Sequence, residues 1–316
     1  MITIHRILCP VDFSEYSLAA LRQALAIARW HEADVTVLHV EDRLLQTARA
    51  DARLRPHVSG SPEEDLRAFA ESAGASVRPI DVHVTAGEPA PVIVEHAKRE
   101  TADLIVMGTQ GRSGLSRVLL GSIAERVVRE APCPVMTVPP GAQASRGVAP
   151  FDPILCASDF SPSCRRALDL AVAMAQEADA RLLLLHAIEV PPVHTGVLPM
   201  AATIEDVIDR ADLRRSAAGR LRRGLPEDAV FRCHPEVLVV DGHPADSILH
   251  VAHDEDVKLI VMGAQTRGTI DRMLFGSTTR RVIQGARCPV LSVRADEHAA
   301  PWVPWPDSAR EEVASA

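Results

Sequence analysis

The sequence predicts an α/β fold of two tandem domains, each a parallel sheet covered by helices on both faces. Apolar segments of strand length alternate with segments of helical periodicity along the 316 residues. The strand segments are almost continuously apolar, as burial on both faces of a parallel sheet requires. The second half of the chain also repeats the motifs of the first. Together these observations favour a duplicated domain over a single large one.

The first domain is expected to span residues 1–140, with five strands and four helices. Apolar runs predict strands at 4–9, 35–40, 77–85, 104–107 and 134–138. Helical periodicity predicts helices at 15–30, from 61 onward, at 89–100 and at 122–130. Ser14 is the expected N-cap of the first helix, and Ser61 with Pro62 marks the start of the second.

The second domain repeats these elements at two slightly different offsets. Equivalent pairs are Asp12 and Asp159, Gly108 and Gly263, Gly121 and Gly276, and Ser122 and Ser277. The first pair is 147 residues apart and the other three are 155 apart, so the second copy has gained residues around 189–202. We therefore predict a linker at 141–152, a second domain at 153–294 and a C-terminal tail at 295–316.

Composition narrows the classes of partner. The chain is 47% hydrophobic and 24% charged, as expected for a globular protein with a core. It is only 3% aromatic and carries a net charge of −8, which counts against binding to DNA or RNA. No apolar stretch approaches the roughly 20 residues of a membrane span, and no signal peptide is recognisable. We expect a cytoplasmic protein with neither a nucleic-acid nor a membrane partner.

The six cysteines and the histidines give no strong indication of a metal site. There is no C-x-x-C motif, and four cysteines occupy matching places in the repeats, so neither disulfides nor zinc are expected. His250 and His253 lie on one predicted helix near two aspartates, and we interpret them as part of a solvated polar face. His39 and His186 recur at the end of the second strand, where they either line a pocket or satisfy a strand end.

The loop between the fourth strand and the fourth helix has the character of an anion-binding loop. It begins at Gly108 and ends at Gly121, directly before Ser122. Glycines let backbone N–H groups approach a ligand closely, and a helix N-terminus favours negative charge. Ser122 with Glu125 also reads as a capping box, which is a purely structural interpretation. Phosphate is the expected ligand.

The position of Asp12 turns a phosphate site into a nucleotide site. Ligands of parallel α/β sheets bind at the carboxyl ends of strands, where the strand order reverses. Asp12 follows the first strand and Gly108 follows the fourth. If these strands are neighbours, a carboxylate that accepts hydrogen bonds from a sugar or an adenine faces the phosphate loop. Neither a Walker A motif nor a Gly-x-Ser-x-Gly elbow is present, which weakens kinase and hydrolase interpretations.

These residues carry a resemblance to a known family. Gly108, Gly111, Gly121 and Ser122 match the spacing Gly, two residues, Gly, nine residues, Gly, Ser/Thr. With Asp12, they make the chain resemble a tandem universal stress protein over residues 2–140 and 153–294. The resemblance implies two Rossmann-like domains of the adenine-nucleotide-hydrolase type, each with strand order 3-2-1-4-5. It also implies antiparallel pairing of the two last strands, so that one chain mimics a homodimer; association of two chains is left open.

The resemblance also assigns roles to individual residues. It places Asp12 and the backbone near Val40 at the adenosine, Gly108 near the ribose, and Gly111, Gly121 and Ser122 at the phosphates. The candidate set in the first domain is Pro10, Val11, Asp12, Val40, Met107, Gly108, Gly111, Arg112, Gly121 and Ser122. The expected cofactor is ATP, with or without Mg²⁺.

The second copy departs from the pattern at two places. It retains Asp159, Gly263, Gly276 and Ser277, which complete the candidate set. Thr266 replaces the counterpart of Gly111, and a β-branched residue fits poorly at positive φ. Arg280 replaces Glu125 and puts a cation near the positive end of a helix, a conflict that a bound anion would relieve. We predict one good site in the first domain and a weak or lost site in the second.

Three functions remain open at this stage. The first is an ATP-binding stress or regulatory protein with little turnover, since no general base and no carboxylate pair for Mg²⁺ is identifiable and no catalytic residue is assigned. The second is a slow ATP-hydrolysing switch. The third is an interaction module that no longer uses nucleotide, with its glycines kept for the fold.

Overall fold

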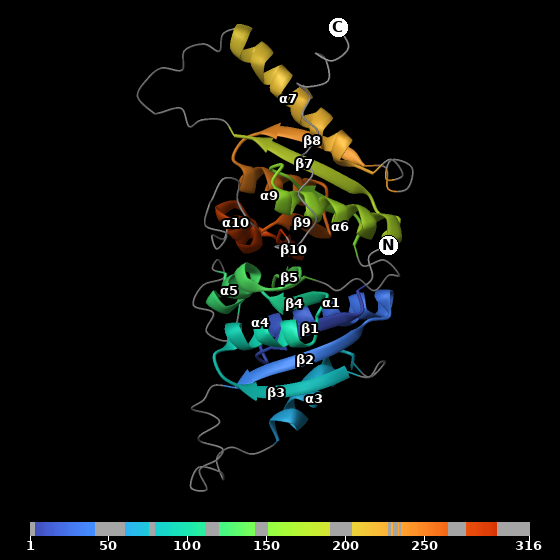
Figure 1. Cartoon of the computed structure of the whole chain (residues 1–316), viewed down its shortest axis with the longest axis vertical. Coiled ribbons are helices and arrows are strands. Elements are labelled where there is room, and N and C mark those ends of the chain that lie inside the picture. The colour runs from blue at the N-terminus through green and yellow to red at the C-terminus, as the bar shows by residue number, and fades with distance from the viewer. Residues whose placement is uncertain are drawn as a thin grey trace, which may run out of the picture.

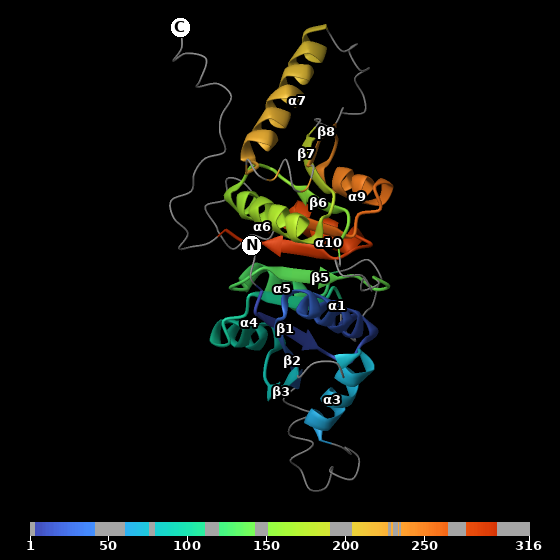
Figure 2. The same cartoon turned by 90° about the vertical axis from the view of Figure 1, so that its right-hand side faces the viewer.

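A computed structural model describes residues 4–41, 61–75, 80–110, 120–142, 151–189, 204–226, 235–264 and 276–295, together with Ala229 and Cys233. Two α/β halves of similar architecture lie one above the other along the long axis of the molecule (Figure 1). The same arrangement is visible after a quarter turn (Figure 2). The predicted parallel α/β architecture is confirmed.

Strands and helices alternate in both halves. The first half contains β1 (Arg6–Val11), α1 (Glu15–His31), β2 (Asp34–Glu41), α3 (Pro62–Ser72), β3 (Ile80–Ala86), α4 (Pro89–Arg99), β4 (Leu104–Gly108), α5 (Ser122–Glu130) and β5 (Val135–Val138). The second contains β6 (Ile154–Ala157), α6 (Pro162–Ala178), β7 (Leu182–Ile188), α7 (Ile204–Gly224), β8 (Glu236–Asp241), α9 (Pro244–Asp254), β9 (Leu259–Gly263), α10 (Ser277–Gly285) and β10 (Val290–Val293).

All ten strands form one continuous sheet in the order β3-β2-β1-β4-β5-β10-β9-β6-β7-β8. Neighbours within each half are parallel, whereas β5 and β10 pair antiparallel where the halves meet. In both halves the first strand therefore lies between the second and the fourth. The strand order reverses at this point, and in folds of this kind ligands bind at the carboxyl ends of the strands that flank the reversal.

The core consists of two apolar layers, one on each face of the sheet. Helices α1, α3, α6 and α7 cover one face, burying side chains such as Leu21, Leu66, Leu168 and Leu221. Helices α4, α5, α9 and α10 cover the other, burying Ile93, Val127, Ile248 and Val282. Each layer contains residues of both halves, so the shared sheet joins their packing.

Helix and strand boundaries follow the predictions closely, with two informative differences. β1 continues through Pro10 and Val11, which pair with Leu38 and His39 of β2, so the predicted turn begins only at Asp12. Ser61 holds the N-cap position of α3, but its hydroxyl bonds to the Glu63 carboxylate, 2.8 Å away, rather than to a helix N–H. The start of the strand predicted at 77–85 lies outside the described residues, as does most of the segment 189–202.

Candidate functional site

Most of the predicted site residues of the first half gather at one edge of the sheet. Pro10 and Val11 end β1, Val40 lies near the end of β2, and Met107 and Gly108 end β4. Asp12 follows β1, and Gly121 and Ser122 open α5. Because β1 pairs with both β2 and β4 in parallel, these carboxyl ends lie side by side. Gly111 and Arg112 lie outside the described residues.

Asp12 is fixed by a local hydrogen-bond arrangement that also starts helix α1. Its Oδ1 accepts hydrogen bonds from the Ser14 backbone N–H at 3.1 Å and from the Ser14 hydroxyl at 2.5 Å. The Ser14 hydroxyl oxygen in turn accepts from the Ser17 N–H, which confirms Ser14 as the N-cap. Phe13, between them, is left-handed with φ of 63°. Asp12, which the sequence analysis assigned to a nucleotide site, thus has a structural role at the start of α1.

The second half reproduces this arrangement around Asp159. The Asp159 carboxylate accepts from the Ser161 N–H at 2.8 Å, and Phe160 is again left-handed with φ of 63°. The Ser161 hydroxyl caps α6 by accepting from the Cys164 N–H. The recurrence of an aspartate after the first strand is therefore explained by the start of the following helix, whether or not nucleotide binds.

The two recurring histidines tie neighbouring strand ends together. His39 Nδ1 lies 2.9 Å from the Val11 carbonyl oxygen, and His186 Nδ1 lies 2.8 Å from that of Ser158. A carbonyl only accepts hydrogen bonds, so Nδ1 is the protonated nitrogen in both rings. Each ring also packs on the phenylalanine of the adjacent loop, with the Phe13 and His39 centroids 4.6 Å apart. Both histidines are satisfied strand-end residues that also help to shape the site edge.

Gly108 and Gly263 are required by packing. A Cβ atom at Gly108 would lie 2.9 Å from Tyr16 Cβ and 3.0 Å from the Tyr16 carbonyl carbon on α1. At Gly263 it would lie 2.5 Å from Ser163 Oγ and 2.9 Å from the Cys164 backbone nitrogen on α6. Both halves therefore need glycine here to let the first helix approach the fourth strand.

The loop after the fourth strand is closed at its base in both halves. The Gly121 N–H donates to the Thr109 carbonyl at 2.9 Å, and the Gly276 N–H donates to the Ala264 carbonyl at 3.4 Å. The intervening loops, including Thr266, lie outside the described residues.

The predicted capping box at Ser122 is wrong. The N-cap of α5 is Gly121, whose extended backbone has φ of −62° and ψ of 141° and whose carbonyl accepts from the Glu125 N–H at 2.9 Å. Ser122 is the first helical residue, and Glu125 is therefore too far along the helix to close a capping box. Gly121 has no side chain with which to cap the helix, so the start of α5 lacks a side-chain cap. An N-terminus of this kind suits an anionic ligand.

The predicted conflict at Arg280 is resolved within the protein. Its guanidinium Nη2 lies 3.3 Å from Glu125 Oε2, across the junction between the halves. Arg280 is also one position further into α10 than predicted, since Gly276 rather than Ser277 is the N-cap. A bound anion is not needed to balance this charge.

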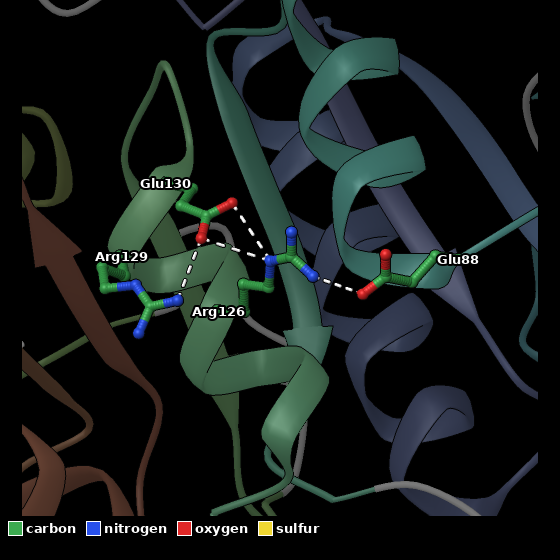
Figure 3. Close-up of polar contacts among 4 residues, drawn as sticks. All are labelled: Glu88, Arg126, Arg129 and Glu130. Carbon is green, nitrogen blue, oxygen red and sulfur yellow. Dashed lines mark hydrogen bonds and ion pairs between the residues drawn. The ribbon is translucent and has the colours of Figure 1, made fainter. Parts of the chain in front are cut away.

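An arginine network that no sequence pattern indicated holds α5 against α4. Arg126 on α5 contacts Glu88, the N-cap residue of α4, and also bonds Glu130 at 3.2 Å (Figure 3). Hydrogen bonds from Arg129 and Arg126 lower the pKa of Glu130. The counterpart Arg281 bonds Asp246 at 2.9 Å in the second half. The sequence could have indicated this network only through the recurrence of the arginine 155 residues later. The acidic partners of the arginine differ between the copies, so they do not recur with it.

A hollow of about 360 Å³ lies at the junction of the halves, beside the base of the first-half loop. The first half contributes Thr109, Gln110, Leu120, Pro139, Pro140 and Gly141, and the second contributes Ile283, Gln284, Ala286 and Arg287. The hollow adjoins the base of the loop but contains none of the strand-end residues of the predicted adenosine site.

Other candidate sites receive little support. The described residues contain no group of three or more metal-ligating side chains. His250 pairs with Asp254 at 3.2 Å, and both are exposed, in keeping with a solvated polar face. None of the six cysteines, which all lie in the described parts of the chain, forms a disulfide. Within the described parts of the chain, no helix has the length and apolarity needed to cross a membrane.

Comparison with known proteins supplies the family. The model of the universal stress protein family matches residues 3–139 and again 150–294. The chain belongs to the universal stress protein family. A universal stress protein of Mycolicibacterium smegmatis is 30% identical over 304 residues, covering 92% of this chain and 98% of that protein. Both halves are thus family domains, and the tandem arrangement also occurs in a relative of similar length.

A solved structure of similar length has the same fold. A universal stress protein from Archaeoglobus fulgidus covers 92% of this chain and is itself covered to 98%, with 23% identity and a TM-score of 0.63. A universal stress protein in complex with cAMP matches 44% of this chain with 25% identity and a TM-score of 0.34. The first of these shows the fold alone, and the ligand of the second is a property of that protein.

Proposed function

We propose that this tandem universal stress protein binds ATP, with or without Mg²⁺, and that the first half holds the nucleotide. The observation that carries the proposal is the arrangement at the carboxyl ends of β1 and β4. The Asp12 carboxylate follows β1 there, and β4 leads into a glycine loop that is closed at its base. The loop ends at the N-terminus of α5, which has no side-chain cap. Such an edge offers acceptors for the nucleoside and backbone donors for the phosphates.

The conformation of Gly121 supports a role in leaving space for a ligand. Its φ of −62° and ψ of 141° lie in the region open to any residue. The backbone therefore does not require glycine here, in contrast to the packing requirement at Gly108. A glycine that neither conformation nor capping requires fits a place that a phosphate approaches closely.

The proposed preference for the first half rests on the loop sequences. Gly276 has nearly the same backbone, with φ of −63° and ψ of 132°, so the helix starts alone do not distinguish the halves. The difference is Gly111 against Thr266, because threonine is disfavoured where a loop turns through positive φ. We propose that the second half binds nucleotide weakly or not at all.

A matched pair of variants tests this proposal. Gly121→Val and Gly276→Val place the same side chain at equivalent helix starts, and valine can adopt both backbones. Titration with ATP should show that Gly121→Val loses about a hundredfold or more in affinity, the equivalent of about two charge-assisted hydrogen bonds. Gly276→Val should change affinity by less than about threefold. Equal losses in the two variants would contradict a single site in the first half.

A second candidate function is an interaction module without nucleotide. The packing roles of Gly108 and Gly263 favour it, because these glycines would be retained even if no ligand were bound. The same titration separates the two: a folded wild-type protein that shows no saturable ATP binding would leave the interaction module as the better function.

A further inference from the structure

The junction between the halves has approximate twofold symmetry that the strand register makes explicit. Met136 of β5 lies opposite Leu291 of β10, and these two residues are equivalents in the repeat, 155 residues apart. The flanking pairs, Thr137 with Val290 and Val135 with Ser292, are mates under the same operation. A twofold axis therefore passes between Met136 and Leu291, as in an isologous dimer interface.

Near such an axis, equivalent residues of the two copies face one another. Glu125 on α5 and Arg280 on α10 are equivalents, again 155 residues apart, and they form the 3.3 Å ion pair across the junction. If two first halves paired in this geometry, Glu125 would face a second Glu125. If two second halves paired, Arg280 would face a second Arg280. Only the mixed pairing sets opposite charges against each other.

Other contacts across the junction are also asymmetric. His31, at the end of α1, lies 3.7 Å from the Glu177 carboxylate at the end of α6, and both side chains are largely buried. Their counterparts in the repeat are Ala178 and Trp30, so neither matched pairing of halves recreates this contact.

A hydrogen bond further disfavours pairing between two first halves. The Arg294 guanidinium donates to the Ala131 carbonyl at 3.0 Å across the junction. The counterpart of Arg294 is Pro139, which has no side-chain donor. At the symmetry-related position, the counterparts Pro139 and Ala286 line the hollow described above.

We propose that Glu125 and Arg280 determine which surfaces pair, so that the first half selects the second half and disfavours its own counterpart in another chain. The underlying physics is the penalty for setting like charges opposite each other, which gives an interface specificity more than raw affinity. His31, Glu177 and Arg294 reinforce the same choice. The partner that fits the β5 edge of the first half, which β10 occupies in this chain, is therefore a second half and not another first half.

Charge variants of the full chain test this proposal. A protease site is inserted within residues 143–150, and the purified, folded protein is cut so that the halves can exchange partners. Native mass spectrometry then gives the ratio of mixed pairs to matched pairs. The variants are Glu125→Arg, Arg280→Glu and the double exchange. Arg281→Glu, which alters a charge that pairs within the second half, is the control.

Each single variant should lower the ratio of mixed to matched pairs by about fivefold, since every pairing then sets like charges together. The double exchange should restore the wild-type ratio, and Arg281→Glu should leave it unchanged. The differences should shrink in about 1 M salt, where these partly exposed charges are screened. A wild-type ratio in both single variants, or a double exchange that restores nothing, would overturn the proposal.

Discussion

The two halves of this universal stress protein share a backbone but differ in the chemistry placed on it. Both anchor an aspartate after the first strand, leave the fourth helix without a side-chain cap, and need a glycine where the first helix crosses the fourth strand. They differ in the loop glycine, in the charges at the junction and in their buried histidines. Because both halves have the features named first, those features cannot show which half is functional. Any functional difference between the halves must therefore come from the residues in which they differ.

The largest expected effect on stability comes from Gly108 and Gly263, which packing requires and which therefore need not mark a ligand site. Gly108→Ala and Gly263→Ala each force a methyl group to within 3.0 Å of backbone atoms of the first helix of the same half, α1 or α6. Each should lower the free energy of unfolding by about 2 kcal/mol, as overpacking does elsewhere. Urea denaturation measures the change.

Gly219→Ala is the matched control, because its new methyl group would meet only the flexible end of Arg223, 3.3 Å away, within helix α7. This variant should be neutral or slightly stabilising, since alanine favours helix more than glycine does. If Gly108→Ala proved equally harmless, the packing explanation would fail and a ligand role for Gly108 would gain weight.

A smaller effect distinguishes the halves by their response to acid. Burial, together with Arg99, lowers the pKa of His96 below its ordinary 6.5, although Glu100 acts in the opposite direction. The unfolded chain therefore binds a proton more readily than the folded one, so stability is complete above pH 6.5 and falls as the pH drops below it. The counterpart of His96 is Val251, so this sensitivity belongs to the first half.

His96→Val gives the first half the residue of its counterpart. The loss of stability between pH 7.5 and 5.5, followed by urea midpoints, should be smaller in this variant than in the wild type. His31, whose pKa burial also lowers, remains and should preserve part of the response. An unchanged pH dependence would show that His96 titrates alike in the folded and unfolded states.

Sequence periodicity predicted the fold well because each element carries its own signal. Apolar runs located the strands, and Ser14 marked a helix start that the structure confirms. The side-chain contacts at the site were harder to foresee. The prediction of a capping box at Ser122 was wrong because the helix begins one residue earlier than expected, with Gly121 as the N-cap and Ser122 as the first helical residue. Glu125 was then free to bond Arg280, a partner distant in sequence that no local pattern identifies.

The repeat identified which residues lie at the site but not the contacts that these residues make. The sequence located Asp12 and Gly108 at neighbouring strand ends, but not the hydrogen bonds that give Asp12 a structural role or the contact with Tyr16 that explains Gly108. Those depend on how helix α1 packs on the sheet, which is a property of tertiary structure. The Arg126 network was likewise missed, because its partners come from two helices.

The most direct test of the central claim is to denature the freshly purified protein in acid and to quantify the released nucleotide by chromatography. The wild type and Gly276→Val should each release close to one ATP per chain, and Gly121→Val should release almost none. ADP in place of ATP would point to slow hydrolysis in the same site. Two nucleotides per chain, or equal loss in the two variants, would contradict the claim that the first half alone holds the nucleotide.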